Sequence, residues 1–307
     1  VFGTLADTKG FKKPIFLGSL LVGVGGLCVL SVPMGFVAFL VIFIIAKVGY
    51  SCSLVFDDAM LSDVTTPERM DRVSSQGYAW GYIGSCIPFA GCLALVLGAG
   101  ALGLSMVTAM GLSFGITALW WLGFTLPLLR RYEQKHFVER QPHAIRESFA
   151  RLGRTLASVR QEKKIFLFLL AFFFYIDGVN TIIHMSTTYG DMLGLDSTAM
   201  MLALLMVQML GLPFCLLYIR LSSRFGARAM VGFGICVYMF TCVFGFFMHS
   251  AWQFWVLAFL VATSQGGIQA LSRSMFGKMI PDKKRSGEFF GFYDIFGKFS
   301  AIMGPSL

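Results

Sequence analysis

The sequence is 307 residues long, 56% hydrophobic and 13% charged, and it contains 34 glycines and 32 phenylalanines. Because a typical soluble domain is about 25% charged, this composition excludes an ordinary soluble enzyme or binding domain and predicts a polytopic helical membrane protein. The formal net charge of +9 is what positively charged loops facing anionic lipid produce, so it requires no nucleic-acid partner and we expect none.

The basic residues are confined to short stretches of the chain. Of the 25 Lys and Arg residues, 23 fall into five clusters, at 9–13, 69–72, 130–164, 220–228 and 273–285. The stretches between clusters are 44 to 57 residues long, enough for two spanning helices of about 20 residues each and a turn. Since Lys and Arg are retained in cytoplasmic loops, all five clusters are predicted to be cytoplasmic.

The apolar runs predict eight complete membrane spans and the beginning of a ninth. They cover residues 14–31, 35–56, 73–97, 102–129, 165–188, 199–219, 229–249 and 252–272, and the ninth begins near Glu288. We expect an N-terminal half at 1–129, a cytoplasmic basic linker at 130–164 and a C-terminal half at 165–307. Within the linker, apolar residues between 145 and 159 recur at helical spacing. An interfacial amphipathic helix and a solvated linker both explain that pattern.

The opening loop carries a recognisable motif. Its residues 3–13 read GTLADTKGFKK and resemble the G-x-L-A-D-x-x-G-x-K-K loop between the second and third helices of the major facilitator superfamily. The segments 174–183, 266–274 and 288–294 resemble one branch, that of the autophagy-related vacuolar amino-acid effluxer and its bacterial relatives. The resemblance implies an all-α polytopic membrane protein with the major-facilitator fold, of which this chain covers about helices 3 to 11 of 12, without helices 1, 2 and 12.

The same resemblance assigns a role to the opening loop. It implies a conformational switch in which Gly3, Asp7, Gly10 and Lys12 help to hold one state of an alternating-access cycle. Residues 221–226 resemble a second copy of this loop, with Ser223 where an acid is common in the family. The resemblance therefore does not imply a second switch there.

Polar side chains inside the apolar spans are candidates for a substrate or coupling-ion site. An ionisable group at the bilayer centre costs about 2.5 to 3.5 kcal/mol on insertion scales, so it requires a partner or a cavity. Asp177, Thr181 and His184 share one face of a predicted helix, with Asn180 at its flank. This stripe predicts a water-lined cavity, and a polar seam between packed helices is the alternative.

Further candidates lie on other spans. Lys47 is in the middle of a span, where it would contact a substrate carboxylate or pair with an acid on another helix. Gln265 and Gln269 form an uncharged stripe suited to hydrogen bonding of a polar solute. Asp294 and Lys298 are one helical turn apart, the spacing of an ion pair, which would be either structural or a switch that opens when protons or substrate arrive.

Together these features predict a secondary active transporter in which two helical halves give alternating access to a small polar solute. The resemblance implies amino-acid export, with protons as a candidate coupling ion, in the plasma membrane of a bacterium rather than a vacuolar membrane. A non-transporting membrane receptor or scaffold on the same fold is the alternative. The sequence has no H-E-x-x-H or G-x-S-x-G catalytic motif. We expect no enzyme activity, no cofactor and no metal site, and a monomer in the bilayer.

Overall fold

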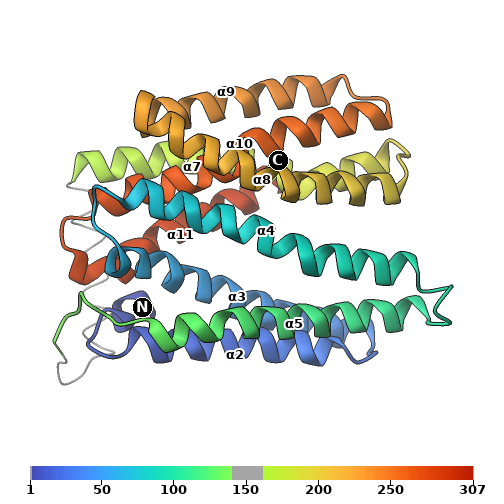
Figure 1. The fold of residues 1–307 in the computed structure, drawn as a ribbon, viewed down its shortest axis with the longest axis horizontal. Helices are drawn as coiled ribbons and strands as arrows, with labels where there is room; N and C mark the ends of the chain where they lie inside the picture. Colours follow the sequence, from blue (N-terminus) through green and yellow to red (C-terminus); the bar gives the residue numbers. More distant parts are fainter. Residues whose placement is uncertain (1, 140–161, 307) are drawn as a thin grey trace. The chain divides into compact units, whose positions relative to one another are not determined.

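The computed structural model describes residues 2–139 and 162–306, which form helices joined by short connections (Figure 1). The helices are α1 (Phe2–Ala6), α2 (Lys12–Leu30), α3 (Phe36–Val64), α4 (Met70–Leu97), α5 (Met106–Arg131), α7 (Lys163–Met192), α8 (Ser197–Phe225), α9 (Ala227–Phe246), α10 (Ala251–Met279), the 3-10 turn η1 (Lys283–Arg285) and α11 (Ser286–Ser306). The amphipathic pattern between residues 145 and 159 lies outside the described residues.

Eight of the described helices, α2 to α5 and α7 to α10, are long and apolar enough to cross a membrane. Each overlaps one of the predicted complete spans, so the span prediction is confirmed in number and order, whereas several of the predicted ends differ by one to four residues. The predicted ninth segment is helical as α11, although it is not among the eight that meet the criteria of length and hydropathy.

Several helices extend beyond the predicted spans. The third helix continues past Phe56 to Val64, and α8 continues to Phe225. The prediction followed the apolar run, whereas the backbone remains helical where polar residues have packing partners. Ser62 and Asp63, in the additional turns of α3, are buried. These extra turns place polar side chains at the end of the helix, beyond the apolar run.

Contacts divide the described chain into two compact units. Unit 1 comprises the described residues within 1–64, 87–155 and 281–291. Unit 2 comprises those within 65–86, 156–280 and 292–307. Helices α4 and α11 therefore contribute to both units. Each unit is described below on its own, and the division into sequence halves at the basic linker stays a prediction.

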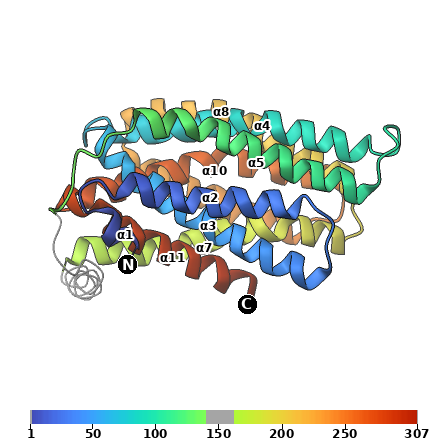
Figure 2. The ribbon, with the colours of Figure 1, turned by 90° about the horizontal axis from the view of Figure 1, so that it is seen from below.

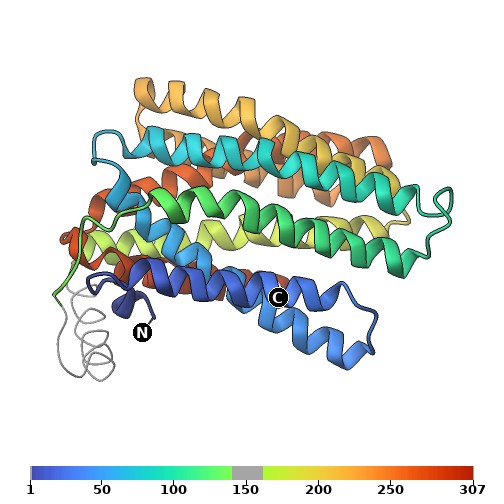
Figure 3. The same ribbon diagram turned by 60° about the horizontal axis from the view of Figure 1, so that its bottom comes forward.

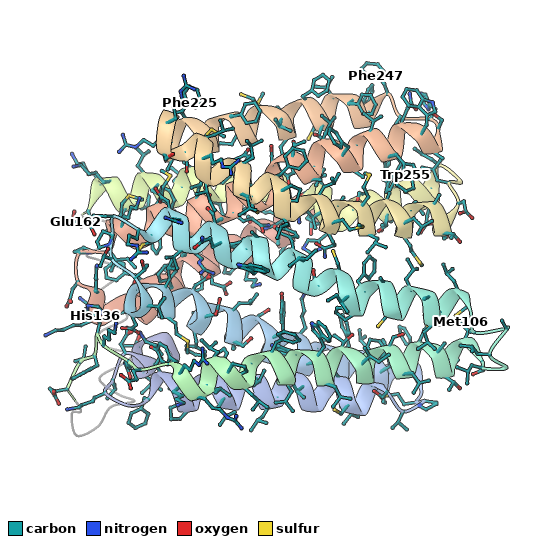
Figure 4. All side chains as sticks on the ribbon, viewed as in Figure 1. Met106, His136, Glu162, Phe225, Phe247 and Trp255 are labelled. Atoms are coloured by element: carbon teal, nitrogen blue, oxygen red, sulfur yellow. The ribbon has the colours of Figure 1, made fainter. Side chains whose placement is uncertain are left out.

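In unit 1, α2 packs against α3 and α5 (Figures 1 and 2). Side chains added at Gly26 or Gly49 would overlap the opposing helix, so these glycines allow α2 and α3 to approach closely. Figure 4 shows Met106 and His136 near opposite ends of α5. The end at His136 also carries the basic residues Lys9, Lys12, Lys13, Arg130 and Arg131. We call it the basic end of unit 1.

In unit 2, α10 is the most buried helix and packs against α7, α8 and α9 (Figure 3). Tyr218 of α8 occupies the space beside Gly267, and Tyr82 of α4 occupies the space beside Gly266. Phe225 and Phe247 mark the two ends of α9 (Figure 4). Glycines therefore permit close packing in both units. In unit 1 they face the backbone of the opposing helix, and in unit 2 they face tyrosine rings.

Candidate functional site: two interlocks

Asp7 of the opening loop is fully buried and binds the first turn of α11. Its Oδ1 accepts a hydrogen bond from the Gly287 amide at 2.7 Å, and its Oδ2 accepts one from the Glu288 amide at 2.9 Å. Amides in the first turn of a helix have no acceptor within the helix and favour an anion. The carboxylate of Asp7 therefore docks the predicted switch loop onto α11.

Lys12, the first residue of α2, is also fully buried and lies beside this contact. Its Nζ donates to Asp63 Oδ2 at 3.0 Å and to Ser286 Oγ at 3.1 Å, and it lies 3.9 Å from Asp7 Oδ1. A buried ammonium is tolerated only when its partners compensate for lost hydration. Here two carboxylates and a hydroxyl from three segments supply that compensation.

The segment that follows α5, residues 132–139, completes the coordination of Asp63. We call this segment the strap. The Tyr132 hydroxyl donates to Asp63 Oδ2. The His136 amide donates to Asp63 Oδ1 at 2.9 Å, and the His136 ring Nδ1 lies 3.1 Å from the same oxygen. The Asp63 carboxylate is thus held by Lys12, Tyr132 and His136, and it fixes the strap beside the loop.

The strap also runs alongside the opening loop. The Val138 amide donates to the Asp7 carbonyl at 2.8 Å, and the Lys9 amide donates to the Val138 carbonyl at 3.0 Å. The Gln134 side chain bonds to the opening loop at two points. Its Oε1 accepts from the Gly10 amide, and its Nε2 donates to the Ala6 carbonyl, each at 3.1 Å. The loop is therefore fixed by side-chain and backbone contacts together.

Two predicted switch residues are glycines for identifiable reasons. Gly10 has a φ of +77°, a conformation that costs other residues about 1 to 2 kcal/mol. Gly3 is limited by space instead, because a Cβ atom there would overlap the Gly287 carbonyl oxygen. Gly3 thus allows the close approach of the loop to α11, whereas Gly10 allows the turn of the loop that precedes α2.

Burial changes the acid–base behaviour of this cluster, which we call the Asp7 interlock (Asp7, Lys12, Asp63, Ser286, Gly287, Glu288 and the strap). Burial raises the pKa of Asp7 from 3.8 to about 7, against the opposing effects of Lys12 and the two amides of α11. Burial, and then the hydrogen bond to Asp63, raise the pKa of the Tyr132 hydroxyl. Tyr132 is therefore a hydrogen-bond donor at any physiological pH.

A second interlock lies in unit 2, between the first turn of α4 and the end of α10. Ser274 Oγ donates to Asp71 Oδ1 at 2.7 Å, and Lys278 Nζ lies 2.6 Å from Asp71 Oδ2. One turn along each helix, Ser74 Oγ donates to the Ala270 carbonyl at 2.8 Å. We call this cluster the Asp71 interlock.

Both interlocks join distant parts of the sequence. The Asp7 interlock connects Asp7 and Lys12 with residues 286–288. The Asp71 interlock connects residues 71–74 with residues 270–278. In terms of the predicted division, each ties the N-terminal half to the C-terminal half. All the segments involved border the basic clusters of the sequence.

The predicted stripe on α7 contacts the last turns of α11, within unit 2. Asp177 Oδ1 accepts from the Gly304 amide at 2.9 Å, and Asn180 Nδ2 donates to the Gly297 carbonyl at 3.4 Å. The Thr181 hydroxyl is buried against Gly304 and has no hydrogen-bond partner among the described residues. The structure thus brings these three side chains to one face of α11, and their role in binding stays a prediction.

The other predicted site residues are dispersed. His184 is exposed on α7, and Gln265 and Gln269 are partly buried on α10. The Lys298 Nζ lies 3.8 Å from Asp294 Oδ1, so the pair that the spacing allows is formed.

Lys47 is an exposed residue of α3, with its Nζ 5.3 Å from the centre of the Tyr50 ring. It belongs to unit 1, whereas the other candidates for the substrate site belong to unit 2.

Sequence reasoning missed several members of the interlocks. Asp63 lies between a predicted span and the basic cluster at 69–72, and Asp71 lies within that cluster, so their nearness to basic residues is the signal that the sequence offers. Ser286 and the strap residues give no comparable signal, because their partners are far away in the sequence.

The fold defined by these helices is that of a major-facilitator transporter. The structure is similar to the human organic anion transporter MFSD10 (TETRAN), with a TM-score of 0.73 and 16% identity, covering 99% of this chain and 72% of that one. It is also similar to a bacterial homologue of the iron transporter ferroportin in its outward-facing state, with a TM-score of 0.58 and 14% identity, covering 99% and 77% of the two chains.

Sequence comparison identifies the family. The model described as vacuole effluxer Atg22 like matches residues 62–307. The uncharacterized MFS-type transporter YxiO of Bacillus subtilis (strain 168) is 46% identical over 311 residues, covering all of this chain and 72% of that protein. Autophagy-related protein 22 of Coccidioides immitis (strain RS) is 26% identical over 291 residues, covering 80% and 47%. The chain belongs to the Atg22-like family of the major facilitator superfamily, as predicted, and is a multi-pass membrane transporter.

Proposed function

We propose that this protein is a secondary active transporter that exports a small polar solute, with amino acids as the first substrate class, by alternating access between its two sequence halves. The observation that carries the proposal is the pair of interlocks. Each consists of buried or partly buried charges and hydrogen bonds that join segments of both halves near the basic clusters. Such contacts have two discrete states, made or broken, as an alternating-access gate requires.

In this proposal the interlocks close the side of the protein that carries the basic clusters, which we place in the cytoplasm. Entry of a solute from that side requires Asp7 to leave the first turn of α11 and Asp71 to leave Ser274 and Lys278. Broken contacts would expose Lys12 and Asp63 to water, which compensates for their lost partners. The two states can therefore be close in free energy.

Two observations support the substrate class. The matching family model is described as vacuole effluxer. The polar groups of α7 include a carboxylate at Asp177 and a hydroxyl at Thr181 that has no hydrogen-bond partner in the described part of the chain. Such groups suit a ligand that carries an ammonium group. The bacterial relative at 46% identity supports a bacterial plasma membrane as the location.

The direct experiment measures flux of a panel of labelled amino acids in proteoliposomes of the full-length protein, with and without a pH gradient. We expect flux of at least one amino acid, and a loss of flux in Asp177→Asn and Lys47→Ala. Asp191→Asn is the matched control for the first variant, because Asp191 is an exposed acid at the far end of α7.

Unchanged flux in both site variants would overturn the proposed site. Saturable amino-acid binding without net flux, in wild type and variants alike, would instead establish the receptor or scaffold. A dependence of flux on the pH gradient would identify protons as the coupling ion.

A further inference from the structure

Unit 1 contains a cavity that adjoins the Asp7 interlock. Its volume is about 420 Å³, and it opens to the surface where α2 begins and α5 ends. Pro14 and Leu17 of α2 and Leu129 of α5 form its apolar walls. The volume lies within the range of about 300 to 1,000 Å³ typical of ligand sites. We call this cavity the α2–α5 groove.

One cation lies in the wall of the groove and others are close in sequence. Lys13, the second residue of α2, lines it and is exposed. No ion-pair partner of Lys13 occurs among residues 2–139 and 162–306, the part that the structure describes. Arg130 and Arg131, which are also exposed, follow Leu129 directly. Among the described residues that line the groove none is acidic, and Lys13 carries a positive charge.

The position of the groove limits what can occupy it. Both α2 and α5 are candidate membrane spans, and the groove lies where both meet a basic cluster. That is the level of lipid headgroups, where a long Lys side chain keeps its ammonium in the polar layer while its stem lies on apolar surface. The site therefore offers apolar walls for hydrocarbon and a cation for an anion at the same point.

We propose that the α2–α5 groove binds one anionic phospholipid, with the phosphate of its headgroup at Lys13 and an acyl chain against Leu17 and Leu129. A zwitterionic lipid carries its own ammonium and gains less from Lys13, whereas a free phosphate would gain nothing from the apolar walls. The chemistry of the walls thus selects a lipid, and the cation selects an anionic one.

The groove is connected to the Asp7 interlock through shared residues. Tyr132, Gln134 and Gly10 line the groove, and the same three residues bond to Asp63, to the Ala6 carbonyl and to each other in the interlock. A lipid in the groove would cover the outer side of the strap. Lipid binding is therefore expected to stabilise the closed interlock, because that arrangement forms the wall.

The test measures the affinity of the detergent-solubilised full-length protein for phosphatidylglycerol and phosphatidylcholine with identical acyl chains, by native mass spectrometry. Inorganic phosphate and glycerol phosphate form a third arm, which separates a lipid site from a free-anion site. One Lys at a membrane surface contributes about 1 kcal/mol, so Lys13→Ala should weaken phosphatidylglycerol binding about fivefold and abolish its preference over phosphatidylcholine.

Matched variants show whether the effect belongs to the groove. Leu17→Trp should fill it and weaken both lipids, whereas Leu21→Trp, an exposed position one turn further along α2, should not. Arg228→Ala is the control for charge, because Arg228 is an exposed cation and the second residue of α9. Equal losses in Lys13→Ala and Arg228→Ala, binding unchanged by Leu17→Trp, or free phosphate binding as tightly as the lipid would each overturn the proposal.

Discussion

The buried ammonium of Lys12 holds two acids that belong to different segments. Removing one partner of a buried ion pair costs about 3 to 5 kcal/mol, because the other charge stays buried without compensation. We expect Lys12→Met to destabilise the protein by about 3 kcal/mol, measured by thermal unfolding in detergent.

Two further variants test the reason for that loss. The double variant Lys12→Met with Asp63→Asn should recover part of it, since the uncompensated carboxylate is then gone. Lys9→Met, which removes an exposed pair with Glu139, should change little, because exposed pairs contribute under about 1 kcal/mol. A loss in Lys9→Met equal to that in Lys12→Met would contradict the account.

Asp7 gives the Asp7 interlock a dependence on pH. Its pKa is about 7 when docked on α11, against the ordinary value of 3.8. The docked state therefore keeps a proton that the undocked state releases between pH 4 and 7. Docking is favoured at low pH, weakens as pH rises through that window and is constant above it.

Hydrogen exchange of the Gly287 and Glu288 amides measures this dependence directly. After correction for intrinsic exchange, their protection should fall between pH 4 and 7 in the wild-type protein. The part due to Asp7 should vanish in Asp7→Asn, because the amide side chain does not titrate in this range. Protection that rises with pH would show that Lys12 and the α11 amides outweigh burial.

At the scale of elements, the strap determines how firmly the opening loop is held. Gln134 contributes two hydrogen bonds to the loop, each worth about 1 kcal/mol at this partly buried position. We expect Gln134→Ala, which removes the bond of about 1 kcal/mol to the Gly10 amide, to speed exchange of that amide about fivefold. Lys135→Ala, at the exposed neighbouring position, is the control. Equal exchange rates in the two variants would contradict the role of Gln134 in holding the loop.

The elements themselves were largely predictable from the sequence, and their contacts were not. Apolar runs predicted the eight spans because lipid requires them. The resemblance pointed to Asp7 and Lys12. By contrast, Asp63 lies 51 residues from Lys12 and 73 residues from His136. Hydrophobic periodicity reports only which face of a helix is buried, so it carries no information about such distant partners.

At the scale of the whole molecule, the central claim is that the interlocks must open during transport. A pair of cysteines tests it in a background without the seven native cysteines. Asp71→Cys and Ser274→Cys place thiols where a hydrogen bond now joins α4 to α10. The same protein can then be compared oxidised and reduced, so any effect of the substitutions themselves cancels.

The decisive measurement is amino-acid flux in proteoliposomes of this double-cysteine variant before and after reduction. The account predicts that oxidation abolishes flux in proportion to the cross-linked fraction, that reduction restores it, and that the single-cysteine variants do not respond. Full flux through cross-linked protein would contradict the claim that the Asp71 interlock opens during the transport cycle.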